Sequence, residues 1–273
     1  MSELLGLEHF AIRPDGPTLT LSVSAGQSMA VVGPAGAGKS QLLRTLAGRE
    51  RPAQGTIQLR AKVAIAGETS YSRRAKVQSL ARRPGVSMQE ATEILSATRL
   101  WDVRHLSMGD LSPSQLAATE LVEALLTEAP IAMIDGQLDG LDPWALPAVL
   151  EMLRGQRAKG RTLIVATHRP DLIREQDALI VLYDGQVRFA GSIDDLLRAG
   201  PPHSLEVGTE NQPGVRSLVA PFRVSIRPSE SGMRLEAPEG QELAARLLLE
   251  GYGDVKFVIV RPPTIEEALR AVV

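Results

Sequence analysis

The chain has 273 residues, of which 23% are charged and 44% belong to the apolar set, and its formal net charge is −2. This length can bury the core of one large α/β domain and leave a small appendage. No apolar run approaches the roughly 18 residues that a membrane-spanning helix needs. The absence of cysteine excludes disulfides and thiolate sites, and the balanced charge argues against broad nucleic-acid binding.

The N-terminal third predicts strands that lead into a glycine-rich loop and a helix. Residues 4–32 alternate like short strands, and the apolar run 29–32 ends at the loop. From Ser40 onward, Leu42, Leu43 and Leu46 have helical spacing. Residues 56–59 and 63–66 predict a short pair of strands, and residues 70–110 are polar, arginine-rich and compatible with helix.

The middle of the chain predicts a buried parallel sheet. Residues 131–134 and 162–166 are wholly apolar strands, separated by a helix over about 143–159. Ser112 resembles an N-cap, and an apolar stripe from Leu116 to Leu125 predicts another helix. Apolar strands that alternate with helices indicate a parallel sheet covered on both faces.

The last part of the chain predicts a small α+β appendage after a linker at residues 199–202. Strands are expected at 222–226, 233–235 and 255–260, and helices at about 241–249 and 264–272.

Residues 33–40 carry the clearest chemical signal. The segment reads GPAGAGKS, which fits G-x-x-x-x-G-K-[ST], and it lies between an apolar strand and a helix. Glycines allow successive N–H groups to face phosphate oxygens at a helix N-terminus. Lys39 is expected to reach the β- and γ-phosphates and Ser40 to bind Mg²⁺, so the chain is expected to bind a nucleoside triphosphate.

Asp135 is the expected carboxylate on the metal side of this site. It follows the apolar strand 131–134 directly, where a charged group is best explained as a ligand. The alternative is an aspartate that only caps the end of the strand.

The order of motifs over about residues 3–198 resembles the ATP-binding subunit of ABC transporters. Besides the phosphate loop, Leu111-Ser-Pro-Ser-Gln115 looks like the LSGGQ signature, and residues 131–143 are similar to the Walker B strand and D-loop. Residues 163–168 match the strand that ends in the switch histidine, and Asp184-Gly-Gln-Val resembles a family hairpin.

The resemblance implies an α/β P-loop fold of ABC type over residues 1–200: a mostly parallel sheet, an N-terminal antiparallel part and a helical insert at about 70–115. Residues 201–273 would be an α+β extension for dimerisation or regulation, similar to that of drug- and polysaccharide-export subunits; an unrelated small domain is the alternative.

The resemblance also implies roles for individual residues. Asp135 would support Mg²⁺, and His168 would contact the γ-phosphate and position water. Ser112 and Ser114 would reach the ATP of a second subunit, Asp142 would link the two sites, and Phe10 would stack on adenine unless it is a core residue. The full set expected to bind ATP is Gly33, Pro34, Ala35, Gly36, Ala37, Gly38, Lys39, Ser40, Gln41, Phe10, Glu68, Ser112, Ser114 and Asp142.

The sequence departs from the family at three places. Gly136 stands where the family has the glutamate that polarises the attacking water, and loss of a general base costs about 10² to 10⁴ in rate. Glu68 stands where the family has the Q-loop glutamine, although Gln78 gives an alternative alignment, and this carboxylate could bind the metal. Pro113 removes one N–H from the signature.

The resemblance, together with these departures, implies a subunit that binds MgATP, dimerises around it as a homodimer or heterodimer and drives a transmembrane permease. It would lie on the cytoplasmic face of the cell membrane, hydrolyse ATP slowly or only with a partner, and bind no nucleic acid. The alternative is a non-hydrolysing regulatory or structural ATP-binding subunit.

Overall fold

The computed structural model describes residues 2–69, 71–82, 85–251 and 253–273. The chain divides into two compact units, Met1–Ser192 and Ile193–Val273. No helix among the described residues is long and apolar enough to cross a membrane.

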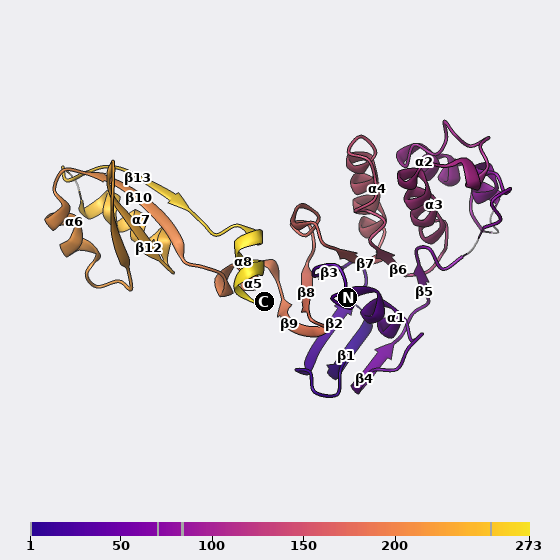
Figure 1. The fold of residues 1–273 in the computed structure, drawn as a ribbon, viewed down its shortest axis with the longest axis horizontal. Helices are drawn as coiled ribbons and strands as arrows, with labels where there is room; N and C mark the ends of the chain where they lie inside the picture. The colour runs from indigo at the N-terminus through magenta and orange to yellow at the C-terminus, as the bar shows by residue number, and fades with distance from the viewer. Residues whose placement is uncertain (1, 70, 83–84, 252) are drawn as a thin grey trace. The chain divides into compact units, whose positions relative to one another are not determined.

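The first unit is built on a six-stranded sheet (Figure 1). Its strands have the order β5-β6-β7-β3-β8-β9, and all neighbours are parallel except β8 and β9. The strands are β3 (Ser28–Val32), β5 (Val63–Ile65), β6 (Ile131–Asp135), β7 (Thr162–Thr167), β8 (Ala178–Tyr183) and β9 (Gln186–Gly191). The mostly parallel sheet expected from the apolar runs is confirmed.

The two faces of this sheet support separate cores. Ile134 and Val165 belong to the core that contains α3 (Pro113–Leu125) and α4 (Leu146–Ala158). Met133 and Ile164, one residue earlier, belong to the core that contains α1 (Lys39–Leu46). Successive side chains of a strand point to opposite faces, so a strand covered by helices on both sides must be apolar throughout.

An antiparallel three-stranded sheet and a mostly helical segment complete the first unit. The sheet has the order β2-β1-β4, with β1 (Glu3–Ala11), β2 (Leu19–Ser24) and β4 (Gln54–Leu59). The segment between β5 and β6 contains α2 (Met88–Ala97), α3 and two short 3₁₀ helices, η1 (Val77–Arg82) and η2 (Met108–Asp110). A third, η3 (Pro170–Leu172), follows β7.

The second unit is an antiparallel sheet with helices. Its strand order is β11-β12-β10-β13, with β10 (His203–Thr209), β11 (Ser225–Ser229), β12 (Gly232–Ala237) and β13 (Val255–Arg261). Its helices are α5 (Ile193–Ala199), α6 (Gln212–Val219), α7 (Gly240–Glu250) and α8 (Ile265–Ala271).

The expected linker at residues 199–202 lies inside the second unit. A Cβ on Gly200 would lie 2.8 Å from the Cβ of Ala268 on α8. Helix α5 therefore packs against α8, and the division between the units precedes α5 instead of following it.

Candidate functional site

The phosphate loop connects β3 to α1 and depends on its glycines. Gly36 and Gly38 have φ angles of 79° and 95°, in the left-handed region that favours glycine. A Cβ on Gly33 would lie 2.3 Å from the carbonyl oxygen of Leu182 on the neighbouring strand β8. Sequence spacing and backbone shape therefore agree that this loop needs glycine at these positions.

The N-terminus of α1 opens onto this loop without a side-chain cap. Gly38 is the N-cap residue, it offers no side-chain hydrogen bond, and the first turn holds no acidic residue. The N–H groups of the first turn are therefore available to an anion, with the positive end of the helix dipole behind them. This turn carries Lys39, Ser40 and Gln41, and residues 33–38 form the loop before it.

Lys39 closes over the loop. Its Nζ donates hydrogen bonds to the carbonyl oxygens of Gly33, at 2.8 Å, and Pro34, at 2.9 Å. Partial burial lowers the pKa of Lys39, and the negative charges of Asp139 and Asp135 oppose this shift. The ammonium group is thus held by two neutral carbonyl acceptors within the field of two carboxylates, and a charged phosphate could displace these acceptors.

Asp135 ends strand β6 and pairs in register with Ala166 on β7. Within the described residues, no hydrogen bond or ion pair engages its carboxylate; its backbone N–H is the group that donates, to Gln137 Oε1 at 2.6 Å. An uncommitted carboxylate in the field of Lys39 fits the donor set that Mg²⁺ prefers.

Asp139 and His168 form a pair that the sequence motifs did not reveal. Nδ1 of His168 lies 2.8 Å from Oδ2 of Asp139, and the His168 backbone N–H donates to the same oxygen at 3.1 Å. The hydroxyl of Thr167 donates to the other carboxylate oxygen. The Asp139 side chain is 9% exposed and the His168 side chain 64% exposed. Asp139 thus fixes one nitrogen of the imidazole ring and leaves Nε2 free of any bond in the described structure.

Gly136 has a backbone that a glutamate would strain. Its φ angle is 85°, although a Cβ there would meet nothing within 4 Å. The neighbouring Gln137 does not replace the missing carboxylate, because its Nε2 donates to Glu120 Oε2 at 2.9 Å and its Oε1 accepts from Asp135. Loss of the family glutamate is therefore accompanied by a backbone conformation suited to glycine.

Glu68 is engaged by a neighbouring arginine. Arg49 donates from Nε and Nη2 to the two carboxylate oxygens at 3.0 and 2.9 Å. These hydrogen bonds lower the pKa of Glu68. The carboxylate can serve as the expected metal ligand only after this pair opens.

Phe10 does not fit its expected place beside adenine. Its side chain is 0% exposed and belongs to the core under the first unit's sheets, together with Leu5 and Leu7. The expected stacking role is wrong for this structure, because a fully buried ring offers no face to a ligand. Arg13 approaches the loop through Gly185: a Cβ on Gly185 would lie 2.6 Å from Nε of Arg13, and Gly185 Cα lies 3.8 Å from the Cβ position of Gly38.

The signature serine begins helix α3. Ser112 Oγ accepts from the N–H of Gln115 at 3.3 Å, and the Ser112 N–H donates to Gln115 Oε1 at 2.9 Å, which forms a capping box. Pro113 occupies the first turn, where a helix does not use its N–H.

Ser114 and Asp142 contact each other within the chain. Ser114 Oγ accepts from the Asp142 N–H at 2.9 Å, and Asp142 Oδ1 accepts from the N–H groups of Trp144 and Ala145. The first turn of the signature helix is thus linked to the loop that follows the Walker B strand.

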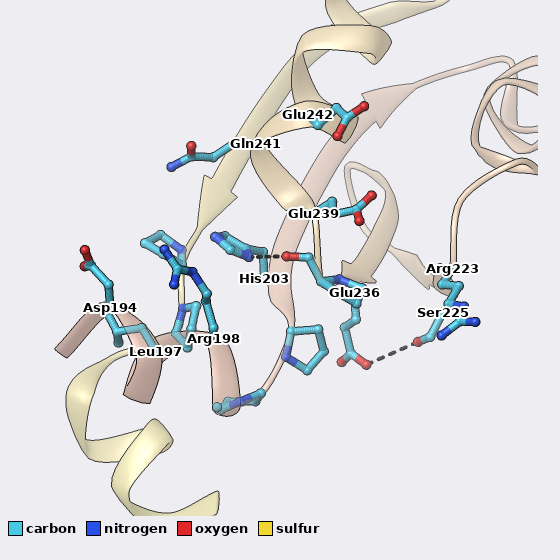
Figure 2. A pocket seen from close by; sticks show the side chains of 16 residues that line it. Asp194, Leu197, Arg198, His203, Arg223, Ser225, Glu236, Glu239, Gln241 and Glu242 are labelled. Atoms are coloured by element: carbon cyan, nitrogen blue, oxygen red, sulfur yellow. Dashed lines mark hydrogen bonds between the residues drawn. The ribbon is translucent and has the colours of Figure 1, made fainter. Parts of the chain in front are cut away.

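A cavity of about 880 Å³ lies in the second unit, apart from these residues (Figure 2). Arg198 and Arg223 line it together with Glu236, Glu239 and Glu242. Its mixture of charges points to no ligand class, and the phosphate loop contributes nothing to it.

Comparison with known proteins identifies the first unit. The family model described as "ABC transporter" matches residues 17–138, which include the phosphate loop, the signature and Asp135. The chain carries the nucleotide-binding domain of the ABC transporter family.

Individual relatives extend this match. The "Nod factor export ATP-binding protein I" of Rhizobium meliloti is 26% identical over 95% of this chain and 84% of its own length. "ABC transporter C family member 13" of Oryza sativa subsp. indica is 27% identical over 70% of this chain and 14% of its own length.

Solved structures agree on the fold. The structure titled "Structure of ATP binding subunit of ABC transporter" has a TM-score of 0.61 and 26% identity over 71% of this chain and 92% of that chain. A nucleotide-free ATP-binding cassette from an ABC transporter has a TM-score of 0.57 and 21% identity, covering 70% of this chain and 92% of that chain.

The expected ABC-type fold is confirmed, and the chain is an ABC transporter ATP-binding subunit. The Rhizobium relative also covers most of the second unit, so the likeness does not stop at the nucleotide-binding domain.

Proposed function

We propose that the chain binds MgATP at the loop 33–40, with Lys39 and the first turn of α1 on the phosphates and Ser40 and Asp135 toward Mg²⁺. The uncapped N-terminus of α1 beside the free carboxylate of Asp135 is the observation that carries this proposal. Bound Mg²⁺ would neutralise phosphate charge. Lys39 would exchange its two carbonyl acceptors for phosphate oxygens.

A second ATP-binding chain and a transmembrane permease are the proposed partners, which would place this subunit on the inner face of the cell membrane. Trp144 is 74% exposed and directly follows the loop residues Asp142 and Pro143. A large exposed aromatic side chain beside a predicted dimer contact supports a partner at that surface. The Rhizobium relative is named for export, which supports export by the complex that this chain would serve.

Hydrolysis on this chain is proposed to be slow. Gly136 offers no carboxylate to the attacking water, and Gln137 is committed to Asp135 and Glu120. The remaining group suited to positioning water is His168, which Asp139 holds through Nδ1. Turnover would therefore depend on an oriented imidazole and lack the usual glutamate.

A non-hydrolysing regulatory subunit is the second candidate, and Gly136 is the observation that favours it. The two candidates are separated by their partner: a membrane-spanning chain would favour the transporter subunit, whereas a purely soluble complex would favour the regulator.

Binding of a fluorescent ATP analogue with Mg²⁺ tests the main proposal. Lys39→Ala is expected to abolish saturable binding, whereas the exposed-charge control Lys159→Ala leaves it unchanged. Equal binding by wild type and Lys39→Ala would contradict the assignment of the loop. Co-purification of a membrane-spanning chain from detergent extracts then separates the transporter from the regulator.

A further inference from the structure

Strand β13 forms an open edge of the second unit's sheet. The strand order β11-β12-β10-β13 leaves it with β10 as its one partner among the described strands. Its outer row of backbone N–H and C=O groups therefore faces no strand in the described part of the chain. Such an edge is a template for pairing with another strand.

The other edge of the same sheet is built differently. Strand β11 has five residues and contains Pro228, which has no N–H to donate, next to Arg227. Strand β13 has seven residues, VKFVIVR, and no proline. Proline and charge are common devices for blocking an edge, and β13 lacks them over residues 257–260.

Most of the large exposed apolar side chains in the described second unit lie on β13 or on α7, the helix that packs against the other face of the strand. Phe257 and Ile259 are 39% and 46% exposed, and α7 adds Leu248 at 57% and Leu249 at 81%. Of the five large exposed apolar side chains in the described second unit, only Val273 lies elsewhere.

The alternation along β13 places Phe257 and Ile259 on one face. Val258 and Val260 pack into the core with α7, so the residues between them face away from the helices. The ring of Phe257 lies over Gly208 on β10, where an added Cβ would come within 2.4 Å of it.

We propose that β13 pairs antiparallel with β13 of a second copy of this chain, joining two four-stranded sheets across a two-fold axis. Pairing centred on Val258 is the two-fold register that uses all seven residues of the strand. It sets Phe257 opposite Ile259 of the partner subunit, on the same face of the joined sheet.

The charges of the strand are compatible with this register. Lys256 meets Val260 of the partner subunit, and Arg261 meets Val255 of the partner subunit, so no cation opposes a cation. Lys256 is also paired with Glu210 of its own chain. Opposed apolar pairs stabilise antiparallel strands, whereas opposed like charges destabilise them. An identical strand supplies both halves of this self-complementary row.

This contact deepens the dimerisation proposed above, but it involves only residues of the second unit and needs no ATP. The two contacts can therefore fail separately. Light scattering gives the mass of the full chain. A dimer without nucleotide reports the β13 contact, and a dimer that needs MgATP reports the nucleotide-dependent contact.

Cysteine cross-linking tests the register without background, because the chain has no cysteine. Phe257→Cys and Ile259→Cys are made on chains with tags of different size and co-expressed, then oxidised without nucleotide. We expect the mixed disulfide to exceed either same-residue disulfide by about tenfold. Opposite Cβ atoms lie about 4.5–5.5 Å apart, whereas same-residue atoms in this register are diagonal neighbours about 7–8 Å apart, beyond the reach of a disulfide.

A charge substitution tests the dimer itself. Without nucleotide, wild type is expected to be dimeric, Ile259→Lys monomeric, and the similarly exposed control Val273→Lys dimeric. Circular dichroism checks that each variant is folded. Monomeric wild type without nucleotide, or same-residue cross-links as strong as the mixed one, would overturn the proposal, as would a strand of another protein cross-linked at these positions in place of this chain. A dimer that appears only with MgATP, without the mixed cross-link, overturns the β13 contact and leaves the nucleotide-dependent one standing.

Discussion

The imidazole Nδ1 of His168 lies 2.8 Å from Oδ2 of Asp139, a carboxylate that is almost fully buried while the ring is exposed. Thr167 and the His168 backbone hold the same carboxylate. Asp139 is therefore a positioning residue for the one histidine at the carboxyl end of β7, in a site that lacks the family's glutamate.

Asp139→Ala is expected to lower single-turnover hydrolysis of ATP by about 10- to 100-fold, as loss of an orienting partner does at other sites, without lowering ATP affinity, because the substitution removes a negative charge from the neighbourhood of Lys39. The double variant Asp139→Ala/His168→Ala should lose no more of the single-turnover rate than His168→Ala alone, because the two residues act as a unit. Thr167→Val, which removes only one bond to Asp139, is the milder control. If His168→Ala slows the reaction and Asp139→Ala does not, the positioning role is wrong.

Gly136→Glu and Gly136→Gln form a matched pair. Both should lose about 1–2 kcal/mol of stability, because a non-glycine residue is strained at a φ of 85°. Only the glutamate can accept a proton, so its single-turnover rate should exceed that of the glutamine variant by about 10²-fold or more. Equal rates in the two variants would show that the missing base is not what limits turnover. Thermal unfolding measured on both checks that the strain is shared.

Ser112→Ala should destabilise the first unit by about 0.5–2 kcal/mol, through loss of the α3 cap. Ser87→Ala is the matched control, since Ser87 Oγ caps α2 by accepting from the Glu90 N–H at 3.1 Å. If Ser112 also contacts ATP across a dimer, only Ser112→Ala weakens ATP-dependent dimerisation at equal stability. If Ser112→Ala and Ser87→Ala weaken ATP-dependent dimerisation equally, Ser112 serves in helix capping alone.

Arg13 is expected to contribute to ATP affinity. A guanidinium beside the phosphate loop can stack on an aromatic base, worth about 0.5–1 kcal/mol at an exposed site, or roughly a two- to fivefold change in Kd. Arg13→Lys keeps the charge but loses the planar group, so it should resemble Arg13→Ala. If Arg13→Ala binds ATP with the affinity of wild type, Arg13 does not contribute to the ATP site.

The pair between Arg49 and Glu68 predicts a pH-dependent effect. Because Arg49 lowers the pKa of Glu68 in the folded chain, the stabilisation is complete above the ordinary value of 4.5 and is lost as the pH falls through the lowered pKa. Both side chains are substantially exposed, so Arg49→Gln should cost at most about 1 kcal/mol at pH 7. Urea unfolding at pH 7 and at about pH 3 should show the difference between variant and wild type shrinking with acid. If the difference in unfolding free energy between variant and wild type is the same at both pH values, the ion pair is not its cause.

The central sheet and the phosphate loop could be predicted because both impose a pattern on neighbouring residues. A strand buried on both faces must be apolar throughout, as residues 131–134 are, and the loop must be glycine-rich. In the second unit, β10 escaped prediction because only Leu205 and Val207 carry its apolar face. Helix α6 escaped because Pro213 and Gly214 lie in its first turn.

The contacts of the site could not be predicted in the same way, because they join residues that are distant in the chain. Nothing in the spacing of Asp139 and His168 indicates that they meet, and the distance of Phe10 from the loop does not indicate that its ring is buried. The sequence carried the types of side chain, and the fold decided which of them are free to act.

The left-handed backbone at Gly136 also bears on how this chain can change over generations. A single substitution can introduce the carboxylate, but it does not supply a backbone suited to carry one, so the substituted chain is expected to be less stable than its parent. A cost of this kind, about 1–2 kcal/mol, counts against the substitution unless a second change elsewhere offsets it. A chain with this loop therefore keeps glycine at this position more easily than it acquires a glutamate.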